Sequence, residues 1–421
     1  MSFVRAVLAG AVCMLSVSVL RAMPAASPTD APNPSLQQAI RALWHSSPEI
    51  DAARAERDAA QARARAAAQP VYNPSLSFDA ENADVDRRTA GVSLTLDLSG
   101  KRKARAAQGS AELAVTQASY DLLRRDITSR WLKAWSAGAL ATKQRELGER
   151  RVELMRRFDE LASKRLKVGD ISSPERDLAG LALGEAQIQQ ASLISREASA
   201  RAALGAISTN TETAAPPLPE SLPPGSQVIV PLSPDERPEM IKARAAQASA
   251  DAGVQVATRA RVPDPTVSLT GGRVDTGPMT DRVIGLSVSI PLPVLNTGRA
   301  EIDAARASAD AAAASTHAQQ LVSKAALQEA RTRYDALLTA AQAFGNSRAA
   351  AFDDRTALLE KLWRAGEIST SEYLVQLKQS LDTALSGLDL ESQVWQAWFD
   401  YLSAAGRLTD WIDGHSQDTH P

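Results

Sequence analysis

Few side chains in this sequence have the type and spacing that enzymatic chemistry requires. The four histidines are His45, His317, His415 and His420, and none has a second histidine, a cysteine or a paired acid at the spacing of a metal site. The single cysteine, Cys13, lies in an apolar N-terminal segment. No G-x-S-x-G, phosphate-loop or H-E-x-x-H motif occurs. The sequence therefore predicts a protein that is not an enzyme and that has no catalytic residue, no cofactor and no bound metal.

Two short segments that resemble each other are the strongest candidates for a functional site. They are Gly169-Asp170-Ile171-Ser172 and Gly366-Glu367-Ile368-Ser369. A glycine that ends one helix and a serine that begins the next explain two positions in each segment. Helix capping does not explain the isoleucine between them, which we expect to be exposed in both segments. An exposed apolar side chain at a helical tip favours a docking surface for a partner protein.

These two segments belong to a duplication that covers most of the chain. Residues 47–50 return at 237–240, residues 73–78 at 264–269, residues 92–96 at 286–290, and residues 169–173 at 366–370. The offset drifts only from 190 to 197 residues, as small loop insertions would produce. The pattern indicates one helix-strand-strand-helix unit used twice.

The N-terminus has the pattern of a secretory signal peptide, which we assign to residues 1–26. Arg5 precedes a mostly apolar run at 6–20, and small residues follow. The run is too short to favour a membrane-spanning helix, and a mature chain without Cys13 would contain no thiol. Gly10-Ala11-Val12 is a poor match to a lipidation signal. The formal net charge of −2, with bases interspersed among acids, argues against a nucleic-acid partner.

Each repeat contains a stretch in which apolar and polar residues alternate with the period of a β-strand. In the first, residues 74–98, Val92 and Leu94 alternate with Ser93 and Thr95. The second repeat shows the same pattern over 284–292. Such hairpins are typical either of a soluble core or of an outer-membrane barrel, whose strands have this length. Two matched hairpins behind a signal peptide favour the barrel.

Long helical stretches follow the strands. No proline interrupts the span from Gly100 to Gly169 or the span from Gly298 to Gly366. Each predicts one continuous rod of roughly 100 Å at about 1.5 Å per residue. Shorter helices are expected at 36–44, 48–68, 173–207, 238–261 and 371–405. We expect 173–207 and 238–261 to stack end to end along the first rod, and 371–405 and 48–68 along the second.

Over its whole mature length the chain resembles the TolC-like outer-membrane efflux family. The resemblance rests on the duplication, the glycines Gly100 and Gly298 after the strands, the two tips, and strand pairs opened by Asn73-Pro74 and Asp264-Pro265. Within that family, Leu98-Ser99-Gly100-Lys101-Arg102 and Ser289-Ile290-Pro291-Leu292-Pro293 resemble the cobalt-zinc-cadmium-resistance branch.

The resemblance implies a homotrimer in the bacterial outer membrane. Each subunit would contribute four strands to one twelve-stranded β-barrel, and its helices would form a tunnel in the periplasm. The tips would meet a periplasmic adaptor (membrane fusion) protein, itself bound to an inner-membrane pump of the resistance-nodulation-division type. Family members often close the entrance with acids just past the tip glycine, which places Glu175 and Glu372 as a possible gate. Acids favoured by the helix dipole are the alternative.

The sequence thus predicts a mainly α-helical chain with a membrane β-barrel contribution. We divide it into the signal peptide (1–26), a first efflux repeat (27–209), a proline-rich linker (210–235), a second repeat (236–407) and a polar C-terminal tail (408–421). The expected function is a passive, trimeric export duct of a tripartite efflux system for heavy-metal cations. The alternatives are the same duct for drugs or other small organic compounds, a periplasmic coiled-coil adaptor, or a structural coiled-coil protein.

Overall fold

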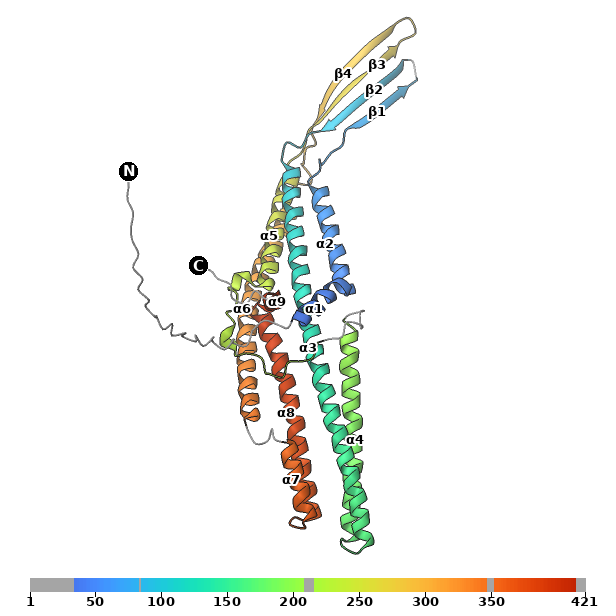
Figure 1. Ribbon diagram of the computed structural model, residues 1–421. Coiled ribbons are helices and arrows are strands. Elements are labelled where there is room, and N and C mark those ends of the chain that lie inside the picture. The colour runs from blue at the N-terminus through green and yellow to red at the C-terminus, as the bar shows by residue number, and fades with distance from the viewer. Residues whose placement is uncertain (1–33, 83–84, 208–215, 347–351, 414–421) are drawn as a thin grey trace, which may run out of the picture.

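The molecule is an elongated rod with a β-sheet at one end and two helical hairpin tips at the other (Figure 1). The computed structural model describes residues 34–82, 85–207, 216–346 and 352–413. The expected signal peptide (1–26), with Cys13, lies outside these residues, and so do His415 and His420.

The helices and strands follow the expected order. They are α1 (Pro34–Ser46), α2 (Pro48–Ala67), β1 (Ser75–Glu81), β2 (Asp86–Thr95), α3 (Lys101–Lys167), α4 (Ser173–Gly205), η1 (Ser226–Val228), η2 (Pro234–Glu236), α5 (Pro238–Ala260), β3 (Thr266–Asp275), β4 (Thr280–Ser289), α6 (Arg299–Gly345), α7 (Phe352–Arg364), α8 (Thr370–Ala404) and α9 (Leu408–Asp413). None of the described helices is both long and apolar enough to cross a lipid bilayer.

The four strands form one antiparallel sheet in the order β1-β2-β3-β4. The register places Val92 opposite both Leu76 and Leu269, and Leu269 opposite Leu286. The sheet joins the helices at Gly100 and Gly298, whose φ angles of 75° and 65° lie in the left-handed region that glycine adopts without strain. The predicted strand pairs and the glycines that follow them are therefore confirmed.

Helix α3 is the centre of the helical rod. It packs against α2 and α4 and also against α5 and α8, whereas α6 packs against α5 and α8. In Figure 1, α2 lies above α4 beside α3, and α5 lies above α8. The stacked pairs are thus α2 with α4 and α5 with α8. Our expectation paired 173–207 with 238–261, and the contacts overturn it because α5 and α8 both fill the space between α3 and α6.

The structure describes two helices in the second rod, on either side of residues 347–351, which lie outside the described residues; the sequence predicts one continuous helix from Gly298 to Gly366. Helix α6 ends at Gly345, Asn346 donates its backbone N–H to Gln342 at 3.0 Å, and α7 begins at Phe352. Glycine and asparagine are weak helix formers that favour helix ends. The first rod lacks such a pair, and α3 is continuous over 67 residues.

Two glycines inside α3 have a packing role that the sequence does not reveal. A Cβ at Gly148 would lie 2.1 Å from the side-chain oxygen of Gln190 on α4, and a Cβ at Gly109 would lie 2.9 Å from Ala67 on α2. Gly109 lets α2 approach α3 closely, and Gly148 leaves room for the Gln190 side chain of α4, which offsets their low helix propensity.

The main hydrophobic core lies midway along the rod, where α1, α3, α6, α8 and α9 meet. The described part of the proline-rich linker crosses it, held by ring donors to its carbonyl oxygens. Trp135 donates to Pro216 at 2.8 Å, Tyr334 to Pro224 at 2.5 Å, and Tyr401 to Ser226 at 3.1 Å. The described part of the linker is therefore held against the helices by hydrogen bonds.

Part of the segment assigned to the polar tail belongs to this core. Residues 408–413 form α9, and Leu408, Trp411 and Ile412 on it are buried. Three apolar residues in six are enough to dock a short helix, so a polar tail can begin no earlier than residue 414.

Candidate functional site

The first tip joins α3 to α4 through a tight glycine turn. Gly169 has a φ of 80°, its N–H bonds to the carbonyl of Leu166 at 3.0 Å, and the N–H of Asp170 reaches the carbonyl of Arg165 at 2.9 Å. This pair of hydrogen bonds is the Schellman motif that closes a helix C-terminus. Ser172 then occupies the N-cap position of α4.

The second tip joins α7 to α8 and repeats this geometry. Gly366 has a φ of 76° and donates to the carbonyl of Trp363 at 3.0 Å, while Glu367 donates to Leu362 at 3.0 Å. Ser369 caps α8. The duplicated residues therefore build duplicated turns, as their spacing predicts.

The two tip isoleucines are not exposed. Ile171 and Ile368 are half-buried and pack against the apolar cluster between the hairpins, where a side chain just after a Schellman turn commonly folds back. Our expectation of an exposed isoleucine is wrong. The exposed apolar side chain at the first tip is Val168, at 79% exposure, directly before Gly169.

Glu175 and Glu372 each close a capping box at the start of a helix. The N–H and the hydroxyl of Ser172 both donate to Glu175 at 2.8 Å. Ser369 donates to Glu372 from its N–H at 2.9 Å and from its hydroxyl at 3.0 Å. Backbone and side-chain hydrogen bonds from the serines lower the pKa of each carboxyl, so both are charged at neutral pH.

An aromatic cluster joins the two hairpins above the tips. Phe158 of α3 lies 4.6 Å from Trp363 of α7 and 5.1 Å from Tyr373 of α8, measured between ring centroids. Arg165 places its guanidinium carbon 4.7 Å from the centre of the Trp363 ring, and Trp363 donates to Thr370 at 3.3 Å. Burial raises the pKa of Tyr373 to about 12. Sequence patterns do not reveal this cluster, because α3 is far in the sequence from α7 and α8.

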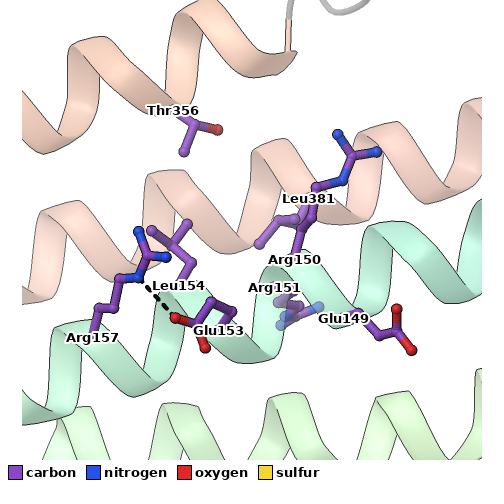
Figure 2. Close-up of a pocket in the computed structure, with 8 residues that line it drawn as sticks. All are labelled: Glu149, Arg150, Arg151, Glu153, Leu154, Arg157, Thr356 and Leu381. Carbon is purple, nitrogen blue, oxygen red and sulfur yellow. Dashed lines mark hydrogen bonds and ion pairs between the residues drawn. The ribbon is translucent and has the colours of Figure 1, made fainter.

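A cavity of 440 Å³ lies beside α3, α7 and α8 (Figure 2). Its lining consists of Glu149, Arg150, Arg151, Glu153, Leu154, Arg157, Thr356 and Leu381. Glu153 forms an ion pair with Arg157 at 2.9 Å, and Arg151 forms one with Asp382 at 3.2 Å. No group of three potential metal ligands occurs in the described parts of the chain. We assign these paired charges to helix packing.

Within the described residues, the sheet has one apolar face that no other element covers. Residues directly opposite in the register share a face, as do residues two apart along a strand. One face therefore carries Leu76, Val92, Leu269, Leu286 and their neighbours, and Ile284 on it is 86% exposed. The other face carries mainly serine, threonine and glycine, with Val274, Val283 and charged residues such as Arg87 toward the hairpin turns. The strands β1 and β4 each have one edge without a partner among the described strands.

A buried ion pair fixes the sheet to the first rod. Asp264 precedes β3 and contacts Lys101 of α3 at 2.9 Å, Tyr72 at 2.9 Å and Ser99 at 3.3 Å. Its side chain is 1% exposed. Burial by itself raises the pKa of Asp264, but the hydrogen bonds from Lys101 and Tyr72 outweigh burial and hold that pKa below its ordinary value. Asp97 caps α3 by accepting from the N–H of Lys101 at 2.8 Å.

Parts of this sequence match a known protein family and a known protein. The model of the outer membrane efflux protein family matches residues 231–407. The chain is 27% identical over 353 residues to the cobalt-zinc-cadmium resistance protein CzcC of Cupriavidus metallidurans, covering 81% of this chain and 79% of that protein.

Solved structures share the fold at lower identity. A membrane protein from Pseudomonas aeruginosa superposes with a TM-score of 0.74 at 17% identity, covering 91% of this chain and 97% of that one. The Campylobacter jejuni CmeC outer membrane channel gives a TM-score of 0.73 at 14% identity, covering 91% and 89%. These matches agree with the duplicated hairpins and the uncovered sheet. Residues 231–407 thus match the outer membrane efflux protein family, and the chain has the fold of these solved outer-membrane proteins.

Proposed function

We propose that three copies of this chain form a passive export duct for heavy-metal cations in a tripartite efflux system. The observation that carries the proposal is the sheet, which has an uncovered apolar face and an unpaired edge on β1 and on β4. Unpaired strand edges are not tolerated in hydrocarbon, and four strands cannot close on themselves. Pairing β4 of one copy with β1 of the next would remove every edge.

The helical tips support docking of a periplasmic adaptor, itself bound to an inner-membrane pump. Gly169, Asp170, Ile171 and Ser172 of the first tip and Gly366, Glu367, Ile368 and Ser369 of the second form two nearly identical rigid turns at the end of the rod farthest from the sheet (Figure 1). Since the chain has no nucleotide-binding motif, energy for export would come from the pump. Val168 gives the first tip an exposed apolar contact that the second tip, with Ala365, lacks.

An acidic entrance is part of the same proposal. Glu175 and Glu372 occupy matching places after the tip glycines, and three copies would bring six carboxylates to one end of the tunnel. The capping boxes explain why both acids are present, so a gate requires an additional electrostatic effect on passing cations.

The cargo is inferred from the CzcC relative, whose name specifies cobalt, zinc and cadmium resistance. A duct for metal cations needs no tight metal site, because tight binding would slow release. The alternative cargo is drugs or other small organic compounds, carried by the same duct.

The first test is removal of the gene from its host. We expect greater sensitivity to Co²⁺, Zn²⁺ and Cd²⁺, restored by the wild-type chain. Sensitivity to organic compounds alone would replace the cargo but keep the duct. Migration of the unheated protein on a gel as a monomer, in native lipid extract, would contradict the trimer.

A further inference from the structure

Three arginines lie side by side on the apolar face of the sheet. The register places Arg88 of β2 directly opposite Arg273 of β3, and Arg273 directly opposite Arg282 of β4. Since side chains two apart along a strand share a face, this arginine row lies on the same face as Val92, Leu269 and Leu286. All three arginines are exposed.

The arginine row marks one end of the apolar band. The row directly before it consists of Phe78, Ala90, Gly271 and Ile284, and the apolar residues continue back toward the helices as far as Leu96. From Leu96 to Ala90 the strand covers roughly 20 Å, close to the ~25 Å height of the lipid-facing band of outer-membrane barrels. In the proposed duct, the arginines would therefore stand at the depth where hydrocarbon gives way to headgroups, on the side of the hairpin turns and away from the helices.

The row lacks enough acids to balance its charge. Arg88 pairs with Asp86 at 3.2 Å. No carboxylate of the described residues pairs with Arg273 or Arg282. The nearby carboxylate of Asp275 is occupied by its own turn, where it accepts from the N–H of Gly277 at 2.9 Å. Like charges directly opposite each other destabilise a sheet unless an anion lies between them.

We propose that the arginine row binds the phosphate groups of anionic lipids in the outer leaflet of the membrane. The inference rests on the proposed duct, with the apolar face of its sheet toward lipid. Guanidinium groups bind phosphate oxygens in a bidentate manner, and one phosphate can bridge two neighbouring arginines. Such a lipid would neutralise the row and fix the depth of the sheet in the bilayer.

The test compares the retention of an anionic lipid by the full chain and by variants of the row. The protein is reconstituted in vesicles of phosphatidylcholine mixed with phosphatidylglycerol, and the bound lipid is identified after extraction by native mass spectrometry. The variants are R88Q/R273Q/R282Q and the charge-conserving R88K/R273K/R282K. Arg87→Gln is the matched control, because Arg87 is exposed on the same strand but on the opposite face.

We expect the triple glutamine variant to lose its preference for phosphatidylglycerol by about fivefold for each arginine, the contribution typical of a basic residue near an anionic surface. The lysine variant and Arg87→Gln should retain most of it. If the triple glutamine variant folds poorly, the single variants Arg273→Gln and Arg282→Gln should each lose about fivefold.

Equal lipid retention by the wild type and the glutamine variants would overturn the proposal. The proposal would also be overturned if inorganic phosphate, in detergent micelles without lipid, stabilised the wild type as much as phosphatidylglycerol does. The row would then be a site for free phosphate. Channel conductance in the same vesicles keeps this test separate from the duct. Conducting variants without a lipid preference would reject the lipid site alone, whereas a wild type that stays monomeric in the same vesicles would reject the duct.

Discussion

The first repeat keeps its long helix unbroken from Lys101 to Lys167, whereas the second divides the same span between α6 and α7. The helices that pack against the two rods also differ. Helix α3 has helices packed on both sides, while α6 packs against α5 and α8. A break inside α3 would leave buried backbone groups without hydrogen bonds, which is costly. The duplicated pattern therefore specifies two rods whose packing neighbours differ.

The junctions between sheet and helices show a second difference. Asp264 binds Lys101 at the junction inside the chain. The duplication relates Asp264 to Asn73 and Lys101 to Arg299. In a closed trimer, Asn73 of one copy would approach Arg299 of the next, because β4 would meet β1 as β2 meets β3. The junction within each chain is therefore ionic, and the junction between copies would be a neutral residue facing a cation.

The tips differ in their aromatic content. Trp363 and Tyr373 come from the second repeat, and the duplication relates them to Leu166 and Arg176 in the first. The contact between hairpins thus depends on side chains that only one repeat supplies in quantity. This asymmetry gives the largest of the expected effects.

Replacing Trp363 with alanine should destabilise the hairpin end of the rod most. The indole is buried, stacks on Phe158 and Tyr373, and lies under Arg165. Loss of a buried tryptophan side chain costs about 3–5 kcal/mol. Hydrogen exchange of the α7 and α8 amides should rise by a corresponding factor. Leu166→Ala at the equivalent, half-buried position is the matched control, and an equal effect of both changes would show that the repeats are equivalent at the tips.

Replacing Asp264 with alanine should have the next largest effect. The change leaves Lys101 without its partner in a site that is almost closed to water, at a cost of about 3 kcal/mol. The urea midpoint of unfolding should fall, while Asn73→Ala at the equivalent exposed position should leave it nearly unchanged. A midpoint that moves equally in both variants would remove the distinction between the junctions.

The same junction should respond to acid. Because the folded state holds the pKa of Asp264 below its ordinary value of 3.8, its contribution is fully present above that pH and is lost as the pH falls through the folded pKa. The wild type should therefore lose stability at acidic pH more steeply than Asp264→Ala. Parallel curves of unfolding midpoint against pH would contradict this assignment.

Introducing an acid at the junction between copies should make that junction ionic and more stable. Asn73→Asp would place a carboxylate opposite Arg299 of a neighbouring copy in the proposed trimer. A new, partly exposed pair contributes about 0.5–1 kcal/mol. The temperature at which the trimer dissociates on a gel should rise, and the rise should disappear in the double variant Asn73→Asp, Arg299→Gln. A rise that persists in the double variant would show that residue 73 does not face Arg299 of the neighbouring copy.

Periodicity in the sequence predicts the elements well and their partners poorly. The alternation around Val92 and the glycines at the ends of the rods depend on neighbours close in sequence, so they can be read directly. The stacking of α5 on α8, the aromatic cluster around Trp363 and the ion pair of Asp264 depend on contacts between distant segments. Ile171 combines a predictable and an unpredictable feature. Its turn depends on residues nearby in the sequence, whereas its burial depends on α3 and the opposite hairpin.

The smallest structural effect should come from neutralising the two capping acids, and this change tests the proposed gate. In E175Q/E372Q the glutamine oxygen can still accept from Ser172 and Ser369, so both capping boxes can persist and stability should stay within about 0.5 kcal/mol. The charge is removed, so an acidic entrance should lose its block by divalent cations in planar-bilayer recordings. The serine variants Ser172→Ala and Ser369→Ala are the controls, because they disturb the caps and keep the carboxylates. If block by cations survives in E175Q/E372Q, the two acids serve the helix ends alone, and the second tip resembles the first in structure without sharing in a gate.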